Sequence, residues 1–473
     1  MKVLFLVHNL GKTRHFEGVI QGLTERGHSV AITAAHKRNK PLKLAAFAEN
    51  TRVDVVTNPV RRVDEWEPLV RPLRQARDYV RFLGPGYAHT DKLSARARAY
   101  APPGWPERLA AGGTLRGAVA KRALEFAEAL VPSEQYYELF IRSHAPDVVL
   151  VTPLIDFGSY QTDYVKSAHR LGIPVAFLPF SWDNLTNRGL VRITPDRVLV
   201  WNEHQKQEAV GYHGVPAERV IVTGAPRFDD FFSMRPSSTR DEFCARAGMD
   251  AGRPFLLYLC SSHFIAPDEV AFVRRWAHAV RQAPDPTLAS CGILVRPHPA
   301  NAEPWEGAKL DGIENAVVWP EHTKVQADPA LYDSLYHAAA VAGLNTSAMI
   351  EAGILGKSVY TIQTEEFAGG QEQTLHFHYL LAANGGLVEV ADDLRQHVRQ
   401  LADALTHPEA GAERSRRFIE SFVRPRGLDR PVAPLMVDEI ERVAKLRKRP
   451  RRPPIWQGPA RLALLALLKR RVS

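Results

Sequence analysis

Two short stretches in the second half of the chain hold residues that suit phosphate binding. Residues 295–299 (Val-Arg-Pro-His-Pro) place Arg296 and His298 in a loop that two prolines stiffen. Residues 343–357 read as the end of a buried strand that breaks at Asn345 into a helix. Thr346 and Ser347, at the expected helix start, are types that cap helices. A helix start offers free N–H groups and positive partial charge to an anion, so both stretches together predict a nucleotide-diphosphate pocket.

Further residues extend this candidate pocket. Arg296 suits bidentate phosphate binding, and Glu351, one turn into the expected helix, has a carboxylate that can accept hydrogen bonds from a ribose. Ser261 and Ser262 follow another buried strand, where they either contact phosphate or form an ordinary strand-to-helix turn. Gln371 lies in a glycine-rich polar loop that either contacts a donor sugar or merely connects two elements.

Four residues in the first half are candidates for a general base. His15 lies near the end of the loop after the first expected strand, and an ordinary histidine pKa lies near working pH. His8, Asp156 and Asp183 also follow expected strands and compete for the same role. The polar run around Asp183, residues 181–189, is alternatively an Asx-rich turn that hydrogen-bonds its own backbone. Residue types and positions alone leave the choice among the four open.

The elements that must position these residues alternate between strand and helix. Residues 2–7 and 29–33 are apolar strands around a helix that ends near residue 26, a βαβ opening without a G-x-G-x-x-G fingerprint. The same alternation resumes near residue 147 and again from residue 255, which predicts two doubly wound parallel sheets. Ligands of such sheets bind at the carboxyl ends of the strands, so we expect a cleft between two facing domains.

The expected domain boundaries follow from this alternation and from composition. We predict an N-terminal Rossmann-like domain over residues 1–232, with a helical insertion at about 60–140 that is rich in arginine, alanine and proline. A linker follows at residues 233–254. A C-terminal Rossmann-like domain for the nucleotide donor spans residues 255–444, and a basic amphipathic tail spans residues 445–473.

The positive charge of the chain is concentrated in that tail. The formal net charge is +9, but ten of the 61 basic residues lie after residue 444, where there is no acidic residue. The remaining 51 basic residues nearly balance the 52 acidic ones, so we expect no nucleic-acid binding. The tail also contains a short apolar block between cations, which favours an anionic membrane surface over a solvated, disordered segment.

Other sequence features concern compartment and metal. The three cysteines show no metal-binding or redox spacing, the first strand is too short for a signal-peptide core, and no apolar run is long enough to span a membrane. We therefore expect a cytoplasmic protein, peripheral at the inner face of the cell membrane. No D-x-D-like carboxylate cluster precedes the nucleotide elements, so we expect metal-independent chemistry and no cofactor.

With the candidate site residues described above, the sequence resembles the glycosyltransferase-B (GT-B) superfamily over nearly the whole chain to about residue 445. Residues 295–299 and 345–352 are similar to the nucleotide-binding elements of a bacterial branch that contains CDP-glycerol glycerophosphotransferases and capsule or surface-polysaccharide transferases. The resemblance implies two Rossmann-like domains. It also implies that His298 contacts the diphosphate, Ser347 a phosphate, and Glu351 the ribose. The arginine-rich insertion departs from this branch.

The resemblance leads to one expected function and three alternatives. We expect an inverting glycosyltransferase that moves a sugar from a nucleotide-activated donor to a hydroxyl of a glycan or lipid-linked acceptor, in surface polysaccharide or glycolipid biosynthesis. The alternatives are a CDP-glycerol-type glycerophosphotransferase, a nucleotide-sugar 2-epimerase, and a non-catalytic protein that binds nucleotide sugars.

Overall fold

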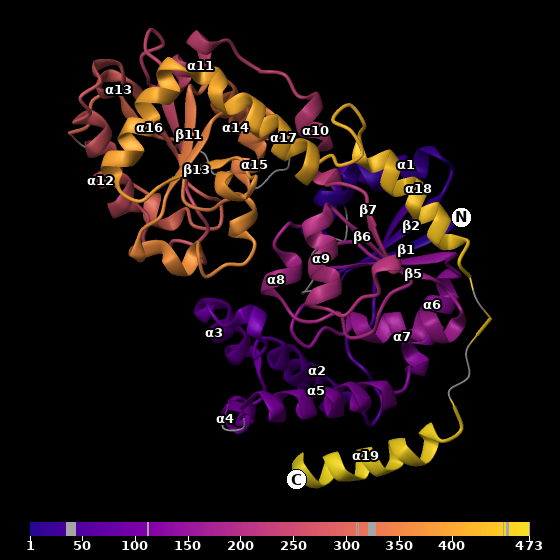
Figure 1. The fold of residues 1–473 in the computed structure, drawn as a ribbon. Coiled ribbons are helices and arrows are strands. Elements are labelled where there is room, and N and C mark those ends of the chain that lie inside the picture. Colours follow the sequence, from indigo (N-terminus) through magenta and orange to yellow (C-terminus); the bar gives the residue numbers. More distant parts are fainter. Residues whose placement is uncertain are drawn as a thin grey trace. The chain divides into compact units, whose positions relative to one another are not determined.

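The computed structural model describes residues 1–34, 44–110, 113–308, 310, 312–319, 328–447, 449–450 and 454–472. The chain forms two compact units. Unit 1 comprises residues 1–227 and 429–473, and unit 2 comprises residues 228–428. Each unit contains its own parallel sheet with helices packed around it (Figure 1). The two doubly wound sheets predicted from the sequence are therefore confirmed.

The sheet of unit 1 has seven parallel strands in the order β3-β2-β1-β4-β5-β6-β7. Its central strands are apolar runs buried on both faces, which is why the sequence alternation identified them. β1 pairs with β2 on one side and with β4 on the other, so the carboxyl ends of β1, β4 and β5 lie side by side. The strands are β1 (Lys2–Val7), β2 (Ser29–Ala34), β3 (Val53–Thr57), β4 (Val148–Thr152), β5 (Val175–Phe177), β6 (Arg197–Val200) and β7 (Val220–Val222).

The predicted helical insertion of unit 1 is present. Its helices α2, α3, α4 and α5 pack on one another over an apolar cluster that includes Trp66, Leu69 and Leu124 (Figure 1). The helices of unit 1 are α1 (Glu17–Glu25), α2 (Glu67–Arg81), α3 (Asp91–Tyr100), α4 (Trp105–Ala110), α5 (Gly113–Leu130), α6 (Gln135–His144), α7 (Gln161–Leu171), α8 (Asn184–Asn187), α9 (Glu203–Gly211), α18 (Val432–Ala444) and α19 (Gln457–Val472).

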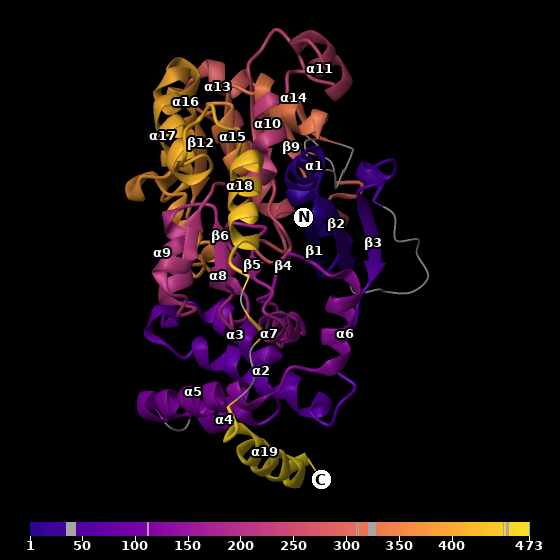
Figure 2. The ribbon, with the colours of Figure 1, turned by 90° about the vertical axis from the view of Figure 1, so that its right-hand side faces the viewer.

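The C-terminal part of the chain belongs to unit 1, which corrects the boundary expected at residue 444. Helix α18 lies beside α1 in both views (Figures 1 and 2). Gly18 and Gly22 of α1 let α18 approach closely, since an added Cβ would meet Ala433 at 3.2 Å and Val437 at 3.3 Å. Arg26 pairs with Asp438 at 2.7 Å. The apolar pattern of α18 predicts that one face of the helix is buried, but it does not indicate which sheet covers that face. The prediction from the sequence therefore assigned α18 to the wrong unit.

Helix α19, in the predicted basic tail, packs on the insertion. Leu465 is buried in the cluster of α2 and α5, and the Arg461 Nε donates a hydrogen bond of 2.8 Å to the Leu130 carbonyl. Within the described part of the chain, no helix combines the length and the hydropathy that a membrane span requires. The tail is thus at least partly a packed element of unit 1.

The sheet of unit 2 has six parallel strands in the order β10-β9-β8-β11-β12-β13. Its strands are β8 (Phe255–Leu259), β9 (Gly292–Arg296), β10 (Ala316–Val318), β11 (Ala340–Gly343), β12 (Val359–Ile362) and β13 (Val388–Ala391). Its helices are α10 (Asp229–Ser233), α11 (Arg240–Ala247), α12 (Val270–Arg281), α13 (Pro286–Ser290), α14 (Pro329–His337), α15 (Ala348–Ile354), α16 (Leu394–Thr406) and α17 (Ala412–Phe422).

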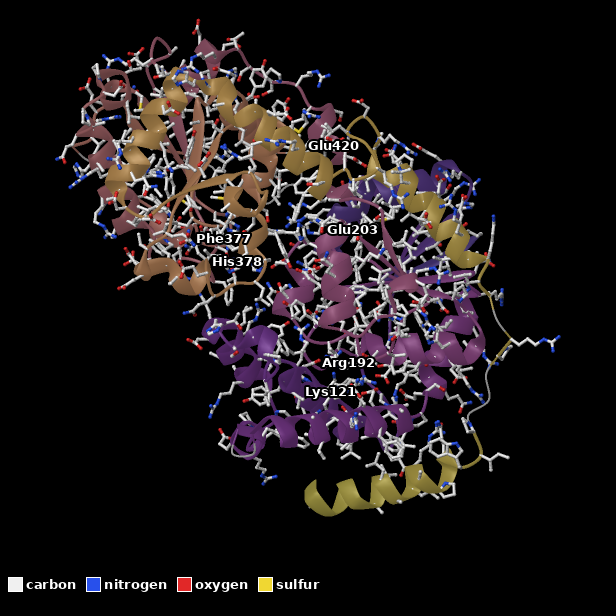
Figure 3. All side chains as sticks on the ribbon, in the orientation of Figure 1. Lys121, Arg192, Glu203, Phe377, His378 and Glu420 are labelled. Atoms are coloured by element: carbon white, nitrogen blue, oxygen red, sulfur yellow. The ribbon has the colours of Figure 1, made fainter. Side chains whose placement is uncertain are left out.

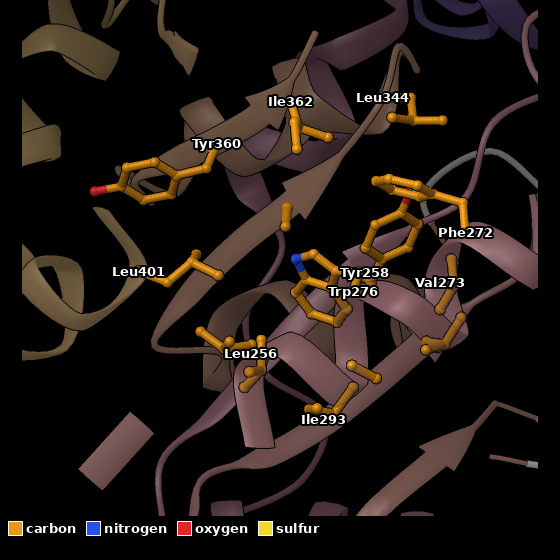
Figure 4. Close-up of a cluster of buried hydrophobic side chains, with 14 of the residues drawn as sticks. Leu256, Tyr258, Phe272, Val273, Trp276, Ile293, Leu344, Tyr360, Ile362 and Leu401 are labelled. Atoms are coloured by element: carbon orange, nitrogen blue, oxygen red, sulfur yellow. The ribbon is translucent and has the colours of Figure 1, made fainter. Parts of the chain in front are cut away.

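One face of this sheet is closed by a core in which Trp276 of α12 is fully buried (Figure 4). Leu256 and Tyr258 of β8, Ile293 of β9 and Leu401 of α16 line the same cluster. Burial of large aromatic and aliphatic side chains on both strands and helices stabilises the unit and fixes the strand ends that carry the site.

Three elements differ from the expectation. Strands β3 and β13 were not predicted, because they are short and partly exposed and their residues alternate weakly. Helix α11 lies inside the predicted linker at 233–254 and begins with a complete capping box between Thr239 and Glu242.

Candidate functional site

The sheet order of unit 2 places three predicted loops at one edge. Strands β9, β8 and β11 are neighbours, so the loops after Arg296, Leu259 and Gly343 leave the sheet side by side. Gly343 is required at this place, since an added Cβ would lie 2.6 Å from the Leu259 carbonyl oxygen. The close approach of β11 to β8 brings the two loops within hydrogen-bond distance of each other.

Hydrogen bonds join three of the predicted segments there. The Asn345 backbone N–H donates to Ser261 Oγ at 3.3 Å, and the Asn345 side-chain amide donates to the Gly370 carbonyl at 2.8 Å. The Gln371 amide donates to the Leu344 carbonyl at 3.1 Å. The structure therefore brings Ser261, Asn345 and Gln371 together at the carboxyl edge. Their contact with a ligand stays a prediction.

Gln371 lies in a tightly packed part of the glycine-rich polar loop. Its side chain is fully buried, and the amide also donates to Thr361 Oγ1 and to the Ile362 carbonyl, each at 3.1 Å. An added Cβ at the neighbouring Gly370 would lie 2.4 Å from the Ile265 carbonyl oxygen, so this segment packs tightly on the loop after β8. Gln371 therefore ties Leu344 to Thr361 and Ile362 at the carboxyl edge of the sheet.

His298 has a geometry that suits a phosphate ligand. Its Nδ1 accepts a hydrogen bond of 3.0 Å from the Ala300 backbone N–H. Burial lowers the pKa of His298 to about 4, so the ring is neutral at pH 7. A neutral imidazole whose Nδ1 accepts carries its proton on Nε2, which can donate to an anionic oxygen.

The Arg296 side chain is bound to other protein groups, whereas we expected it to be available for a phosphate. Its guanidinium donates to Asp328 Oδ2 at 3.0 Å and to Ser334 Oγ at 2.9 Å, and it lies over the Trp319 ring. Only 8% of the residue is exposed. The side chain thus ties the end of β9 to α14, and a direct phosphate contact by Arg296 stays a prediction.

The helix after β11 starts later than predicted. Helix α15 begins at Ala348, with Ser347 at the N-cap position but without a side-chain cap hydrogen bond. The helix thus begins two residues later than expected, because the Thr346 and Ser347 carbonyls first accept turn-type hydrogen bonds from Met349 and Ile350, whereas Ser347 occupies the cap position that its residue type predicts. Thr346 is buried, whereas Ser347 and Glu351 are half-buried.

Glu269 is a buried residue of this edge that the sequence did not single out. It accepts a hydrogen bond of 2.6 Å from the Ser261 backbone N–H and one of 3.0 Å from the Tyr258 hydroxyl. Burial raises the pKa of Glu269 to about 7. Its position just before α12 looks like an ordinary helix start, so no motif marked it. Ser262, next in the loop, accepts turn hydrogen bonds from Ile265 and Ala266.

In unit 1, the general-base candidates gather at the carboxyl ends of β1, β4 and β5. His8 Nδ1 lies 3.7 Å from Asp156 Oδ2, and Arg188 donates to Asp156 Oδ1 at 2.5 Å. The His8 side chain is 48% exposed, whereas that of Asp156 is 27% exposed. This is an accessible imidazole beside a carboxylate that an arginine holds.

His15 is in a different environment. It is 4% exposed and stacks on Phe180, with ring centroids 5.3 Å apart. Burial and the nearby Arg227 and Arg14 lower the pKa of His15 far below its ordinary value. The expectation of an ordinary histidine pKa at this position is wrong, because the sequence does not reveal this burial. The role of His15 as the base stays a prediction.

Asp183 lies in the predicted polar turn. Its carboxylate accepts hydrogen bonds from the Asn187 amide at 2.6 Å and from the Asn184 amide at 3.3 Å. The Asn184 side-chain oxygen accepts hydrogen bonds from the backbone N–H groups of Phe180 at 3.0 Å and Ser181 at 3.2 Å, so the Asx-rich interpretation of residues 181–189 is confirmed locally. A base function for Asp183 stays a prediction beside it.

Cations surround this edge of unit 1 more densely than we expected. The Lys12 ammonium lies 4.0 Å from the centroid of the Phe180 ring, and the Arg188 guanidinium lies 5.2 Å from it. Burial, reinforced by Arg188 and Arg14, lowers the pKa of Lys12 to about 8. The sequence offered a signal in Lys12 and Arg14 around His15, but Arg188 comes from a distant segment.

No protein-family model matches the chain, and no curated protein matches it in sequence. Solved structures are similar in fold. A putative UDP-N-acetylglucosamine 2-epimerase from Listeria monocytogenes matches with a TM-score of 0.54 at 12% identity over 96% of this chain and 99% of its own. A glycosyltransferase from Rickettsia africae matches with a TM-score of 0.52 at 9% identity over 94% and 98%.

A third similar structure is the UDP-GlcNAc 2-epimerase from Neisseria meningitidis bound to UDP-GlcNAc, with a TM-score of 0.52 at 13% identity over 93% of this chain and 99% of its own. These identities are low, so the similarity concerns the fold. The chain therefore has the GT-B fold, which glycosyltransferases and UDP-GlcNAc 2-epimerases share.

Proposed function

We propose that the protein is a glycosyltransferase whose unit 2 binds the nucleotide diphosphate of an activated sugar. The observation that carries the proposal is the convergence of the predicted loops on the neighbouring strands β9, β8 and β11, with a neutral His298 that presents an Nε2–H. Ligands of open parallel sheets bind at this edge. Similar folds with UDP-GlcNAc bound add support.

In the proposed reaction, an acceptor hydroxyl oxygen forms a bond to the anomeric carbon of the sugar. The bond from that carbon to the diphosphate oxygen breaks, and the nucleoside diphosphate leaves with the bonding electrons. His298 Nε2–H stabilises the negative charge of the leaving group by hydrogen bonding. We propose that the reaction inverts the anomeric centre and is metal-independent, as the resemblance implies.

We propose His8 as the base that takes the proton of the acceptor hydroxyl, with Asp156 as the residue that orients it. His8 is the exposed imidazole of the cluster, and Asp156 Oδ2 lies 3.7 Å from its Nδ1. His15 is buried among cations that oppose a proton on its ring.

A nucleotide-sugar 2-epimerase is the second candidate. It is favoured by the fold similarity to structures with that name, which cover this chain as fully as the glycosyltransferase does. An epimerase needs the nucleotide sugar alone, whereas a transferase consumes an acceptor. The two functions therefore differ in the requirement for a second substrate.

We also propose that unit 1 contacts an anionic membrane surface through the region around α19, which would supply a lipid-linked or surface-glycan acceptor. Exposed apolar side chains gather there. Ile455 is 96% exposed, Leu462 is 68% exposed, and Trp456, 56% exposed, stacks on Phe126. Exposed cations such as Arg447 and Arg449 precede them. Apolar and basic residues together suit an anionic interface.

Product analysis tests the proposed reaction. The purified protein is incubated with UDP-, GDP-, CDP-, CMP- and dTDP-linked donors, with and without a membrane extract as the acceptor source. We expect release of a nucleoside diphosphate that depends on the acceptor. CMP released from CDP-glycerol indicates a glycerophosphotransferase, and an epimerised sugar nucleotide without an acceptor indicates an epimerase. Binding without turnover of any donor indicates a binding protein, and each of these outcomes contradicts glycosyl transfer.

A further inference from the structure

Unit 1 contains a cavity that is separate from the candidate site residues described above. Its volume is about 500 Å³. The C-terminal half of α2, the 3-10 turn at residues 85–87, α5, the loop at residues 190–194 and the end of α9 line it. None of the residues predicted to bind nucleotide or to act as a base lies in its wall.

The wall of this cavity is strongly basic. Arg77, Arg81, Lys121, Arg192 and His213 line it, against a single lining carboxylate, Glu125. Figure 3 shows the labelled Lys121, on α5, near Arg192, in the loop before β6. Asp78 neutralises Arg192 by a direct ion pair. Arg77 and Arg81, the other two arginines of the wall, are not neutralised in this way among the described residues.

Arg77 and Arg81 are one turn apart on α2 and have only carbonyl or ring partners. Arg77, 8% exposed, donates to the Arg192 carbonyl at 3.2 Å, and its buried Nε has no hydrogen-bond partner. Arg81 donates to the Leu185 carbonyl at 3.1 Å and to the Arg188 carbonyl. In the part of the chain that the structure describes, neither guanidinium has a carboxylate at ion-pair distance.

His213 places a further hydrogen-bond donor beside Arg81. His213 Nδ1 accepts from the Val191 N–H at 3.1 Å, so the neutral ring carries its proton on Nε2, which donates to the Leu185 carbonyl at 2.7 Å. The Arg81 guanidinium lies 3.0 Å from that same Nε2. Two donors therefore meet at this point of the wall.

Arg74, which lies on the same face of α2 as Arg77 and Arg81 but nearer its start, shows how the protein neutralises a buried arginine. Arg74 pairs with Asp163 at 2.7 Å and with Glu128 at 3.3 Å. A buried charge without such a partner is costly. Among the residues that the structure describes, Arg77 and Arg81 lack such a direct ion pair, and Glu128 and Glu125 act on Arg77 only from beyond ion-pair distance, which indicates that an anionic ligand supplies a direct partner.

We propose that this cavity binds the phosphate of a ligand that has an apolar or aromatic body. Arginine pairs favourably with phosphate, and the remaining wall offers Val80, Tyr87, Val191 and Tyr212 to such a body. The volume lies in the range of small-molecule sites. Since Arg81 also holds the carbonyls of Leu185 and Arg188, the ligand would contact the residue that fixes the segment after Asp183. This site goes beyond the proposed nucleotide site of unit 2.

Calorimetry on the full chain tests the proposal. Inorganic pyrophosphate and geranyl diphosphate are titrated in the presence of saturating UDP, which occupies the proposed site in unit 2. We expect saturable binding of both probes at this second site. Tighter binding of geranyl diphosphate supports a lipid phosphate as the source, and equal binding of the two probes contradicts an apolar or aromatic body in the ligand. Failure of both probes to saturate overturns the proposal.

Variants locate the binding. Arg77→Gln should raise the dissociation constant of pyrophosphate by about tenfold, the loss of one charge-assisted contact. Lys121→Ala changes an exposed residue of α5, so this variant should fold and serves as the test if Arg77→Gln misfolds. Lys121→Ala should weaken pyrophosphate binding by about threefold. Arg122→Ala, its exposed neighbour outside the cavity wall, is the matched control and should change nothing. If pyrophosphate binds to Lys121→Ala and to folded Arg77→Gln as it binds to the natural protein, the proposed cavity site is overturned, even when UDP binds normally. If only UDP fails to bind, the result contradicts the function proposed for unit 2 and not the cavity site.

Discussion

At the scale of single residues, His298 makes the most specific prediction. Its Nε2–H is the donor proposed for the diphosphate, because Nδ1 already accepts from the Ala300 backbone. Replacing His298 with alanine should weaken UDP binding by about tenfold or more, the loss of a hydrogen bond to a charged group. Isothermal titration calorimetry measures it.

The matched control for this variant is His278→Ala, an exposed histidine on α12. It should leave the dissociation constant of UDP unchanged, because it removes the same side chain as His298→Ala but does not alter the carboxyl edge of the sheet. Equal affinities of the His298 and His278 variants would remove His298 from the site.

Glu269 makes a prediction about stability and pH. Its folded pKa is about 7 against 4.5 in the unfolded chain, because burial disfavours the carboxylate. Between pH 4.5 and 7, the unfolded chain releases a proton that the folded chain keeps, so the free energy of unfolding falls as pH rises. Glu269→Gln should abolish this loss, which amounts to about 3 kcal/mol by pH 8.

Urea denaturation followed by tryptophan fluorescence, repeated from pH 4.5 to 8, checks this expectation. The difference in unfolding free energy between the variant and the natural protein should change steadily in favour of the variant as pH rises. A difference that stays constant across this range would mean that Glu269 ionises normally in the folded state.

Only some of the residues at the candidate sites could be predicted from the sequence, and the reason is physical. Ser261, His298 and Asn345 could be found, because polar residues directly after apolar strands must lie at the edge of a parallel sheet. The partners of Arg296 and the burial of His15 could not, because Asp328 and Phe180 come from segments whose approach depends on tertiary packing. Glu269 had no motif at all.

At the scale of elements, the close approach of β11 to β8 makes the next prediction. Gly343→Ala would place a Cβ 2.6 Å from the Leu259 carbonyl oxygen, a contact that the backbone must move to relieve. We expect the free energy of unfolding to fall by about 2 kcal/mol. UDP binding should weaken as well, because the strand positions Asn345.

Gly117→Ala on α5 is the control, since an added Cβ there meets nothing within 4 Å. Glycine is unfavourable inside a helix, so this variant should be more stable by about 0.5–1 kcal/mol. Chemical denaturation measures both variants. A Gly343→Ala protein as stable as the natural one would show that β8 and β11 have more space than this structure gives them.

Elements were predictable from the sequence where their apolar runs are long. The central strands were found for that reason, whereas the helical insertion was found from its composition, which is rich in arginine, alanine and proline. The start of α15 was misplaced because Thr346 and Ser347 favour a cap by type, yet the backbone first makes a tight turn. Local preference of a residue is a weak guide where tertiary contacts set the turn.

At the scale of the whole molecule, the tail makes a prediction about membranes. Replacing Lys445, Arg447 and Arg449 with alanine should lower partitioning onto vesicles that contain anionic phospholipid by about 100-fold at low salt, given about 1 kcal/mol per basic residue. These side chains are exposed, so the fold should be unaffected. Sedimentation with sucrose-loaded vesicles measures the bound fraction.

The control removes three exposed arginines of unit 2 instead: Arg395, Arg399 and Arg417. It carries the same loss of net charge, so it should bind vesicles like the natural protein. Equal loss of binding in both variants would mean that overall charge, and not the tail, attracts the protein to the surface.

The organisation of the whole chain was less predictable than its sheets. Two sheets were expected and are present. The return of the chain to unit 1 at Asp429 was not, because the apolar face of α18 is compatible with packing on either sheet. The fit of Gly18 and Gly22 to α18 and the ion pair of Arg26 with Asp438 place it in unit 1.

A crystal structure of the protein soaked with UDP tests the account most directly. The account predicts that the diphosphate lies at the carboxyl edge of the sheet of unit 2, with an oxygen at hydrogen-bond distance from His298 Nε2 and the ribose near Glu351. A nucleotide bound to any other part of the molecule, with the loops after β8, β9 and β11 empty, would contradict it.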